Sequence, residues 1–259
     1  MDTSASGVLN VESPKEPGVG QITSGLVTQD SLALETLRFV FSQLPAWRDD
    51  PDRPEEHSEK RLNPHLCKFL DSRARHEFPM FRFDREEPQV GRRKADLSAS
   101  LVETTLLEAR TYTIYDPILI IECKRLPAPS KDREREYVTG GGKRNGGIQR
   151  FKLGLYALEH GLAAMIGYIQ DRDGRHWHEK INEWIFDLAG GLITDDCDWK
   201  ADETLEPIVE QESEGISRYR SIHSRMGSVS SNEIELHHFW IAMNRHGTEF
   251  YRGEFEVGG

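Results

Sequence analysis

Apolar residues follow a helical period in the first part of the chain. From Ser31 onward they recur at intervals of three and four residues, which predicts an amphipathic helix that ends before Pro45. The same spacing places Leu62, Leu66 and Leu70 on one face of a second helix. Both stretches therefore predict helices with one apolar face directed at a core.

The pattern then changes to short apolar segments that are typical of strands. Strands are predicted at residues 78–84, 94–101, 109–115 and 118–125. The last of these is apolar at consecutive positions, as expected for a central strand that is covered on both faces. Further along, the spacing predicts helices at 148–160 and 176–188 and strands at 163–170, 218–224 and 234–243. This order predicts an α/β fold with a mixed central sheet flanked by helices.

The chain is expected to form one domain behind a flexible N-terminal arm. Residues 1–28 are rich in small and polar residues without any period, which predicts the arm. Residues 29–259 then form a single α/β domain, with a core at about 55–170 and a C-terminal elaboration at 171–259. A long loop rich in proline, glycine and charge, residues 126–147, is expected to be functional or mobile.

Composition and charge narrow the function classes. No stretch reaches the roughly 20 apolar residues that cross a bilayer, and the first residues do not have the pattern of a signal peptide, so a cytoplasmic location without membrane contact is expected. Three cysteines without close pairs predict neither a disulfide framework nor a zinc knuckle. The net charge of −11 at first disfavours a nucleic-acid partner.

The charge is nevertheless distributed unevenly. Residues 124–150 contain eight Lys and Arg against three acids, whereas residues 195–214 contain nine acids against one Lys. The basic stretch is either a solvated loop or a surface for a polyanion.

The candidate chemistry lies on two predicted strands. Residues two apart in a strand share a face, so Glu122 and Lys124 project together, and Asp96 lies on an upstream strand. Charges after a run of isoleucines are costly unless they are used or paired. Two carboxylates from adjacent strands suit a divalent ion such as Mg²⁺, which prefers oxygen ligands. A cross-strand ion pair is the alternative interpretation.

These residues resemble the core motif of the PD-(D/E)xK, restriction-endonuclease-like nuclease superfamily. The segment KAD ends in Asp96, and the segment IIECKR carries Glu122, 26 positions later, and Lys124. The resemblance implies a restriction-endonuclease-like core in which Asp96 and Glu122 bind Mg²⁺ or Mn²⁺ and Lys124 is catalytic. Ala95 stands where the family's motif has its proline.

The resemblance also implies supporting residues on two helices. Many members carry a glutamate on the first core helix that assists the metal, and Glu59 is the preferred candidate because it precedes Leu62 by three positions on the inward stripe; Glu55 and Glu56 stay open as alternatives. Gln149 stands where related nucleases place a catalytic Gln or Lys. The expected substrate-binding cations are Arg125, Lys143, Arg144 and Arg150. The helix that begins near Gly146 is expected to offer its N-terminus to a phosphate.

The hypothesis from the sequence is a Mg²⁺-dependent nuclease that hydrolyses phosphodiester bonds, with DNA the expected substrate. Because affinity for DNA comes largely from phosphate neutralisation, the acidic chain is expected to act as a homo-oligomer or within a larger complex that gates it. The resemblance to this nuclease superfamily further implies an effector of bacterial restriction or anti-phage defence. The alternatives are a catalytically silent binding or scaffold subunit and an enzyme acting on a small phosphate compound.

Overall fold

The computed structural model describes residues 28–55, 58–107, 110–211, 214–226 and 231–243. The expected N-terminal arm lies outside these residues except for Thr28. Among the helices of the described segments, none has the length and apolar character needed to cross a bilayer.

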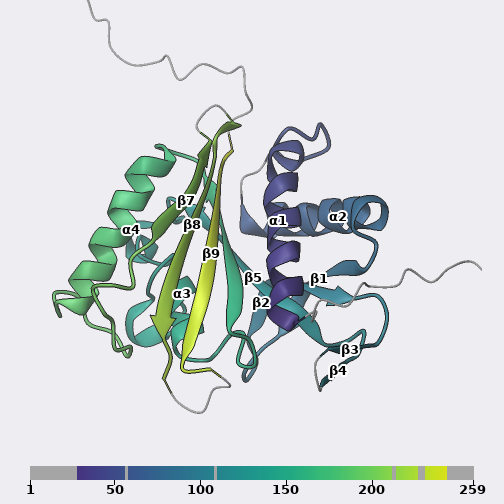
Figure 1. Ribbon diagram of the computed structural model, residues 1–259. Coiled ribbons are helices and arrows are strands. Elements are labelled where there is room, and N and C mark those ends of the chain that lie inside the picture. Colours follow the sequence, from purple (N-terminus) through teal and green to yellow (C-terminus); the bar gives the residue numbers. More distant parts are fainter. Residues whose placement is uncertain (1–27, 56–57, 108–109, 212–213, 227–230, 244–259) are drawn as a thin grey trace, which may run out of the picture.

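A mixed seven-stranded sheet forms the centre of the protein and confirms the predicted α/β class (Figure 1). Its order is β1-β2-β5-β6-β9-β8-β7, with parallel pairing of β5 with β6 and of β6 with β9, and antiparallel pairing elsewhere. The strands are β1 (Phe81–Pro88), β2 (Lys94–Leu101), β5 (Pro117–Leu126), β6 (Leu162–Ile169), β7 (Glu206–Gln211), β8 (Ile216–Ser224) and β9 (Glu233–Ala242). The C-terminal strands therefore continue the same sheet instead of forming a separate layer.

Helices cover both faces of this sheet (Figure 1). Helices α1 (Gln29–Arg48) and α2 (Glu59–Glu77) pack on one face, while α3 (Gly147–Lys152) and α4 (Gly174–Ala189) pack on the other. Helix α1 continues beyond its predicted end through Pro45. The buried indole of Trp47, which donates to His65 Nδ1 at 3.0 Å, ties this last turn to α2.

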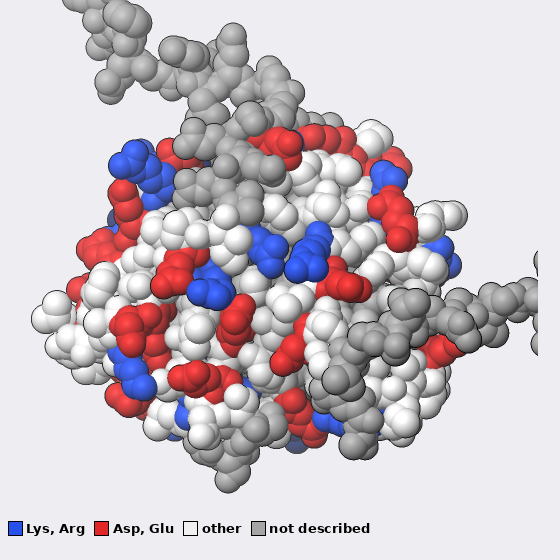
Figure 2. Space-filling view, in the orientation of Figure 1, with Lys and Arg blue, Asp and Glu red and all other residues white. Residues whose placement is uncertain are grey.

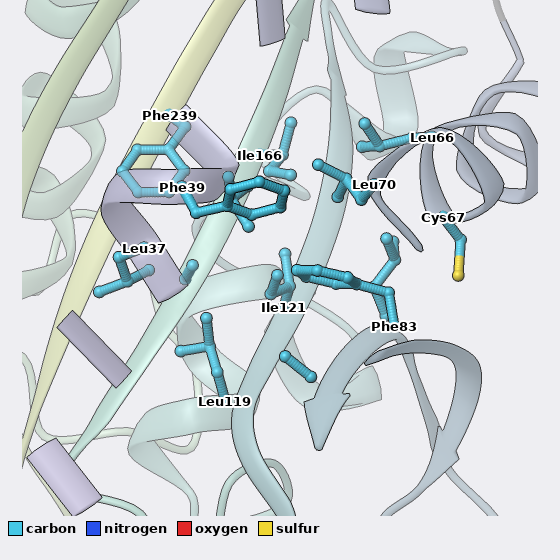
Figure 3. Close-up of a cluster of buried hydrophobic side chains, with 14 of the residues drawn as sticks. Leu37, Phe39, Leu66, Cys67, Leu70, Phe83, Leu119, Ile121, Ile166 and Phe239 are labelled. Atoms are coloured by element: carbon cyan, nitrogen blue, oxygen red, sulfur yellow. The ribbon is translucent and has the colours of Figure 1, made fainter. Parts of the chain in front are cut away.

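The core on the α1–α2 side joins both helices to the central sheet. Figure 3 shows side chains of α1 and α2 meeting those of β1, β5, β6 and β9. Each large apolar side chain buried in this way contributes about 1.5–3 kcal/mol. Strand β5 is covered on both faces, and Ile118 to Ile121 have no exposed surface, as its continuous apolar sequence predicts.

The predicted strand at 109–115 is shorter than expected. Its described part forms β4 (Arg110–Tyr112), which pairs with β3 (Thr105–Leu107) in a small hairpin. The chain turns after β4 because the carboxylate of Asp116 accepts hydrogen bonds from both the backbone N–H and the hydroxyl of Thr113, each at 2.7 Å. Polar turn contacts of this kind override an apolar strand pattern.

The predicted helix at 148–160 is also shorter than expected. Helix α3 ends at Lys152, and positive φ angles follow at Gly154 and Ala157. The buried guanidinium of Arg225 accounts for this change, because it donates to carbonyl oxygens of the turns between α3 and β6. A contact across 65 or more residues cannot be inferred from local spacing.

The long loop at 126–147 is ordered and contributes to the second core. It contains two short 3-10 turns, η1 (Lys131–Arg133) and η2 (Gly141–Lys143), and it buries Tyr137 and Val138 completely. Tyr137 accepts a hydrogen bond from the indole of Trp240 at 2.9 Å and contacts His238 Nδ1 at 2.9 Å. The middle of the loop is thus packed into the second core.

A buried ion pair connects α3 with the acid-rich segment before β7, and its removal should destabilise the protein. Lys152 Nζ lies 2.6 Å from Glu203 Oε1, and neither side chain is exposed. We expect Glu203→Ala to lower the free energy of unfolding by about 3 kcal/mol, because Lys152 is left buried without a counter-charge. Denaturant unfolding monitored by tryptophan fluorescence measures this loss.

The same pair should make stability depend on acid pH. Although burial raises the pKa of Glu203, contacts with His223 and Lys152 lower it to about 2, below its usual value of 4.5. The stabilisation is therefore complete above pH 4.5 and is lost as the pH falls toward 2. Between pH 4.5 and 2 the free energy of unfolding of the wild type should fall more steeply than that of Glu203→Gln. Parallel pH profiles of the two proteins would contradict the assignment of this pH dependence to Glu203.

Candidate active site

The site begins where β2 separates from β5. Strand β2 stays paired with β1 as far as Lys94, but its last partner on β5 is the Leu97–Ile121 pair. Beyond that pair the Cys123 backbone N–H donates to Asp96 Oδ2 at 2.8 Å. The Arg125 N–H, two residues further, donates to Glu59 Oε1 at 3.1 Å. Carboxylates from β2 and α2 therefore bind the amides of β5 that the ladder no longer uses.

Glu122 and Lys124 form a buried pair beside this opening. Lys124 Nζ donates to Glu122 Oε1 at 2.6 Å, and Arg150 Nη1 of α3 donates to the same oxygen at 2.7 Å. Glu122 is 1% exposed. Its second oxygen, Oε2, is buried without a hydrogen-bond partner among the described residues. An unpaired carboxylate oxygen in a buried position is costly unless a cation or another donor joins it.

The charges of these groups act on one another. Burial raises the pKa of Asp96 to about 8, and the neighbouring carboxylates of Glu122 and Glu59 add to this effect, while Lys124 and the Cys123 amide oppose it. Burial alone would lower the pKa of Lys124, yet the carboxylates of Glu122, Glu59 and Asp96 raise it above its ordinary value, so the ammonium stays charged. The four side chains form one electrostatic cluster, as the spacing along the sequence predicts.

The three candidate helix glutamates differ in their positions. Glu59 is the first residue of α2 and contacts β5 through the Arg125 amide. Together with Asp96 it lines a pocket of about 250 Å³. Glu55 is exposed and Glu56 lies outside the described residues. The geometry therefore favours Glu59 over Glu55 as the third carboxylate.

Gln149 has a different place from the catalytic one expected for it. Its side chain is completely buried; Oε1 accepts from the N–H groups of Gly140 and Gly146, and Nε2 donates to the Gly141 carbonyl at 2.8 Å. Nε2 also lies 3.3 Å from Asp195 Oδ2. These contacts occupy the amide, so Gln149 fixes the loop before α3, and its catalytic role stays a prediction.

The beginning of α3 is likewise occupied by the protein itself. The N–H groups of Gly147, Ile148 and Gln149 donate to the carbonyls of Glu136, Tyr137 and Val138 at 2.8–3.1 Å. A phosphate cannot bind amides that already have partners. The expected phosphate site at this helix end is therefore not formed.

The four expected substrate-binding cations separate into distinct environments. Arg150 is paired with Glu122, Arg144 is paired with Asp196 at 2.7 Å, and Arg125 is half-buried beside Glu59, which holds its backbone N–H. Lys143 is exposed and lines a second, larger pocket. They do not form one basic patch around the carboxylates.

Tyr156 belongs to the site although its sequence position gave no sign of this. Its hydroxyl donates to the Lys94 carbonyl at 2.6 Å and accepts from Arg150 Nη1 at 3.0 Å. Its ring also lies under the Arg150 guanidinium, 5.0 Å from centroid to Cζ. Tyr156 therefore holds Arg150 against Glu122. Only the irregular turn after α3 brings it there.

The fit to a divalent metal is partial. Within the described segments, no group of three or more His, Cys, Asp or Glu side chains is arranged to hold an ion. Two observations nevertheless suit a cation: burial and the Glu122 carboxylate raise the pKa of Asp96, and Glu122 Oε2 lacks a hydrogen-bond partner among the described residues. Lys124 and Arg150 both hold Glu122 Oε1, so Oε2 is the oxygen of Glu122 that would face an ion.

Comparison with known proteins does not identify a family. No protein-family model matches the chain, and neither a curated protein nor a solved structure gives a significant match. The functional argument therefore rests on the geometry of the site.

Asp96→Asn tests whether the Asp96 carboxylate destabilises the folded protein when no metal is bound. The folded protein keeps the Asp96 proton up to about pH 8, whereas the usual pKa is 3.8. Its contribution to stability is therefore greatest below pH 3.8 and is lost as the pH rises through 8. With a chelator at pH 8, Asp96→Asn should melt at a higher temperature than the wild type, because the amide oxygen still accepts from Cys123 and carries no charge.

Added Mg²⁺ or Mn²⁺ should reverse this order. A ligand that binds only the folded state stabilises it in proportion to its occupancy, so the wild type should gain melting temperature and Asp96→Asn should gain little. Equal gains in both proteins would show that the ion binds elsewhere.

Proposed function

We propose that this protein is a metal-dependent nuclease that hydrolyses phosphodiester bonds, with DNA as its expected substrate. The observation that carries the proposal is that Asp96 binds the Cys123 amide of β5 between Glu122 and Lys124, so that the charges of these three side chains act on one another. The chain supplies two acids and a charged lysine in one buried cluster, which is the set that metal-assisted hydrolysis requires.

Each side chain has a defined role in this proposal. Asp96 and Glu122 hold a Mg²⁺ or Mn²⁺ ion, and Glu59 supports it from α2. The bound ion supplies a Lewis acid and lowers the pKa of a coordinated water. Lys124, kept charged by its carboxylate neighbours, orients the attacking water and stabilises negative charge that develops on the phosphate.

Arg150 connects substrate binding to this centre. Its guanidinium is held on Glu122 and over Tyr156 with part of its surface exposed. A guanidinium matches phosphate geometry with paired N–H donors, so release from Glu122 frees it to bind the substrate phosphate. Activation by a partner or by oligomerisation suits an acidic chain whose catalytic carboxylate already has two cationic partners.

The neutralisation of Glu122 by two cations also favours a second candidate function. Lys124 and Arg150 together balance Glu122 without any metal. A protein in which this arrangement is permanent would be a catalytically silent binding or scaffold subunit of a nucleic-acid-handling complex.

Cleavage assays separate the two functions. Supercoiled and linear DNA incubated with the wild type and Mg²⁺ or Mn²⁺ should be degraded, and Lys124→Ala should reduce the rate by about 10²-fold or more, because a preorganised cation at the reacting phosphate is lost. Gel electrophoresis over time measures both rates.

Arg75→Ala is the matched control. Arg75 is an exposed cation on α2 that pairs only with Asp71 in its own helix among the described contacts, so its removal should leave cleavage unchanged. Equal cleavage by the wild type and Lys124→Ala would assign the activity to another site. Absence of metal-dependent cleavage, with Mg²⁺ bound in a melting experiment, would favour the silent subunit.

A further inference from the structure

A second pocket lies beside the candidate active site and has no role in the chemistry described above. Its volume is about 550 Å³, and it is enclosed by the loop that carries η1 and η2 and by residues 193–194 after α4. This volume is within the range of small-molecule sites. Charged side chains of both signs line it: the cations Lys131, Arg133, Arg135 and Lys143 and the carboxylates Asp132, Glu134 and Glu136.

The walls of this pocket are held by buried contacts. Gln149 binds Gly140, Gly141 and Gly146, as described above, and so fixes one wall. Asp195 fixes the opposite wall, because its carboxylate accepts from the Thr139 hydroxyl at 2.7 Å and from the Trp199 indole at 2.9 Å. The pocket is therefore preformed, which lowers the entropy cost of binding a ligand there.

The pocket is coupled to the carboxylate cluster in two ways. Gln149 holds the pocket wall, and the next residue, Arg150, contacts Glu122. Arg133 lies in the pocket lining, and the carboxylates of Glu136 and, more weakly, Glu59 raise its pKa. A ligand in the pocket would thus touch a wall that is continuous along the chain with Arg150, which binds Glu122.

The lining favours an anionic ligand only through its unpaired cations, because Arg133 is neutralised by Glu136 and two further carboxylates, Asp132 and Glu134, also line the pocket. Lys131, Arg135 and Lys143 are exposed, and their side chains have no ion-pair partner among the described salt bridges. Thr139 and Asn145 add side chains able to form hydrogen bonds. A nucleotide combines a phosphate for the cations with a base of suitable polarity.

A pocket of this volume accepts an unpaired nucleotide more readily than a duplex. Paired bases are stacked inside the helix and reach a protein pocket only after extrusion. A duplex also needs an extended basic surface, whereas on the face shown in Figure 2 the described cations are interspersed with acids. We propose that this pocket binds one unpaired nucleotide of a DNA strand whose neighbouring phosphate lies at the Asp96–Glu122 centre, so that the substrate is single-stranded or locally unpaired. This inference rests on the proposed nuclease function.

Binding without metal tests the pocket independently of cleavage. Fluorescence anisotropy with a chelator present would compare a labelled single strand of about 12 nucleotides with a hairpin duplex of the same composition. The wild type should bind the single strand more tightly. The double variant Arg135→Ala/Lys143→Ala should lose about tenfold in affinity, and its dependence of log affinity on log salt should be shallower by about 1.4, because two phosphate contacts are lost.

The matched control is Arg73→Ala/Arg75→Ala, which removes two exposed cations from α2 and leaves the pocket intact. It should bind the single strand as the wild type does. Equal affinity of the wild type and the pocket variant for the single strand, or preference of the wild type for the duplex, overturns the inference. Circular dichroism of both variants verifies that each is folded.

Cleavage by the same proteins with Mg²⁺ separates this inference from the proposed function. Pocket-dependent binding of the single strand without any cleavage by the wild type supports the pocket and contradicts the nuclease. Cleavage of duplex and single strand at equal rates, unchanged in the pocket variant, supports the nuclease and contradicts the pocket.

Discussion

The separation of β2 from β5 is the constraint on which the site depends. A continuous ladder would use the β5 amides beyond Ile121 for pairing, and backbone groups in a sheet interior must have partners. Here the carboxylates of Asp96 and Glu59 take the amides of Cys123 and Arg125 instead. Because these bonds satisfy the backbone, they also hold two acids from β2 and α2 beside Glu122. The same two hydrogen bonds thus give the β5 amides their partners and position the acids of the site.

This arrangement concentrates buried charge and must be balanced by the rest of the fold. Burial and repulsion by Glu122 raise the pKa of the Asp96 carboxyl group. The negative charge of Glu122 is balanced by Lys124 and Arg150. The apolar layers on both faces of the sheet provide the stability that such a cluster consumes. Arg150 is the part of the cluster best suited to move, because it is only partly buried and stands on the short helix α3.

The two-residue strand period predicts that Glu122 and Lys124 share a face, and their contact in the structure agrees with it. Glu59 was expected from the resemblance to the nuclease motif, and its role at a metal stays a prediction. The place of Gln149 was not predictable in the same way, because its partners at Gly140 and Asp195 are set by the folded loop. For the same reason the order of the 126–147 loop, the turn that brings Tyr156 to the site, and β7 within an acid-rich segment were missed. Each depends on contacts between distant parts of the chain.

A crystal structure with Mn²⁺ tests the central claim most directly. Anomalous scattering should place one ion within about 2.2 Å of carboxylate oxygens of both Asp96 and Glu122, with Arg150 displaced from Glu122. Such a peak would establish that the separated strands form a metal centre. Crystals that contain Mn²⁺ elsewhere, while Lys124 and Arg150 remain on Glu122 and no peak lies between the two carboxylates, would contradict the account.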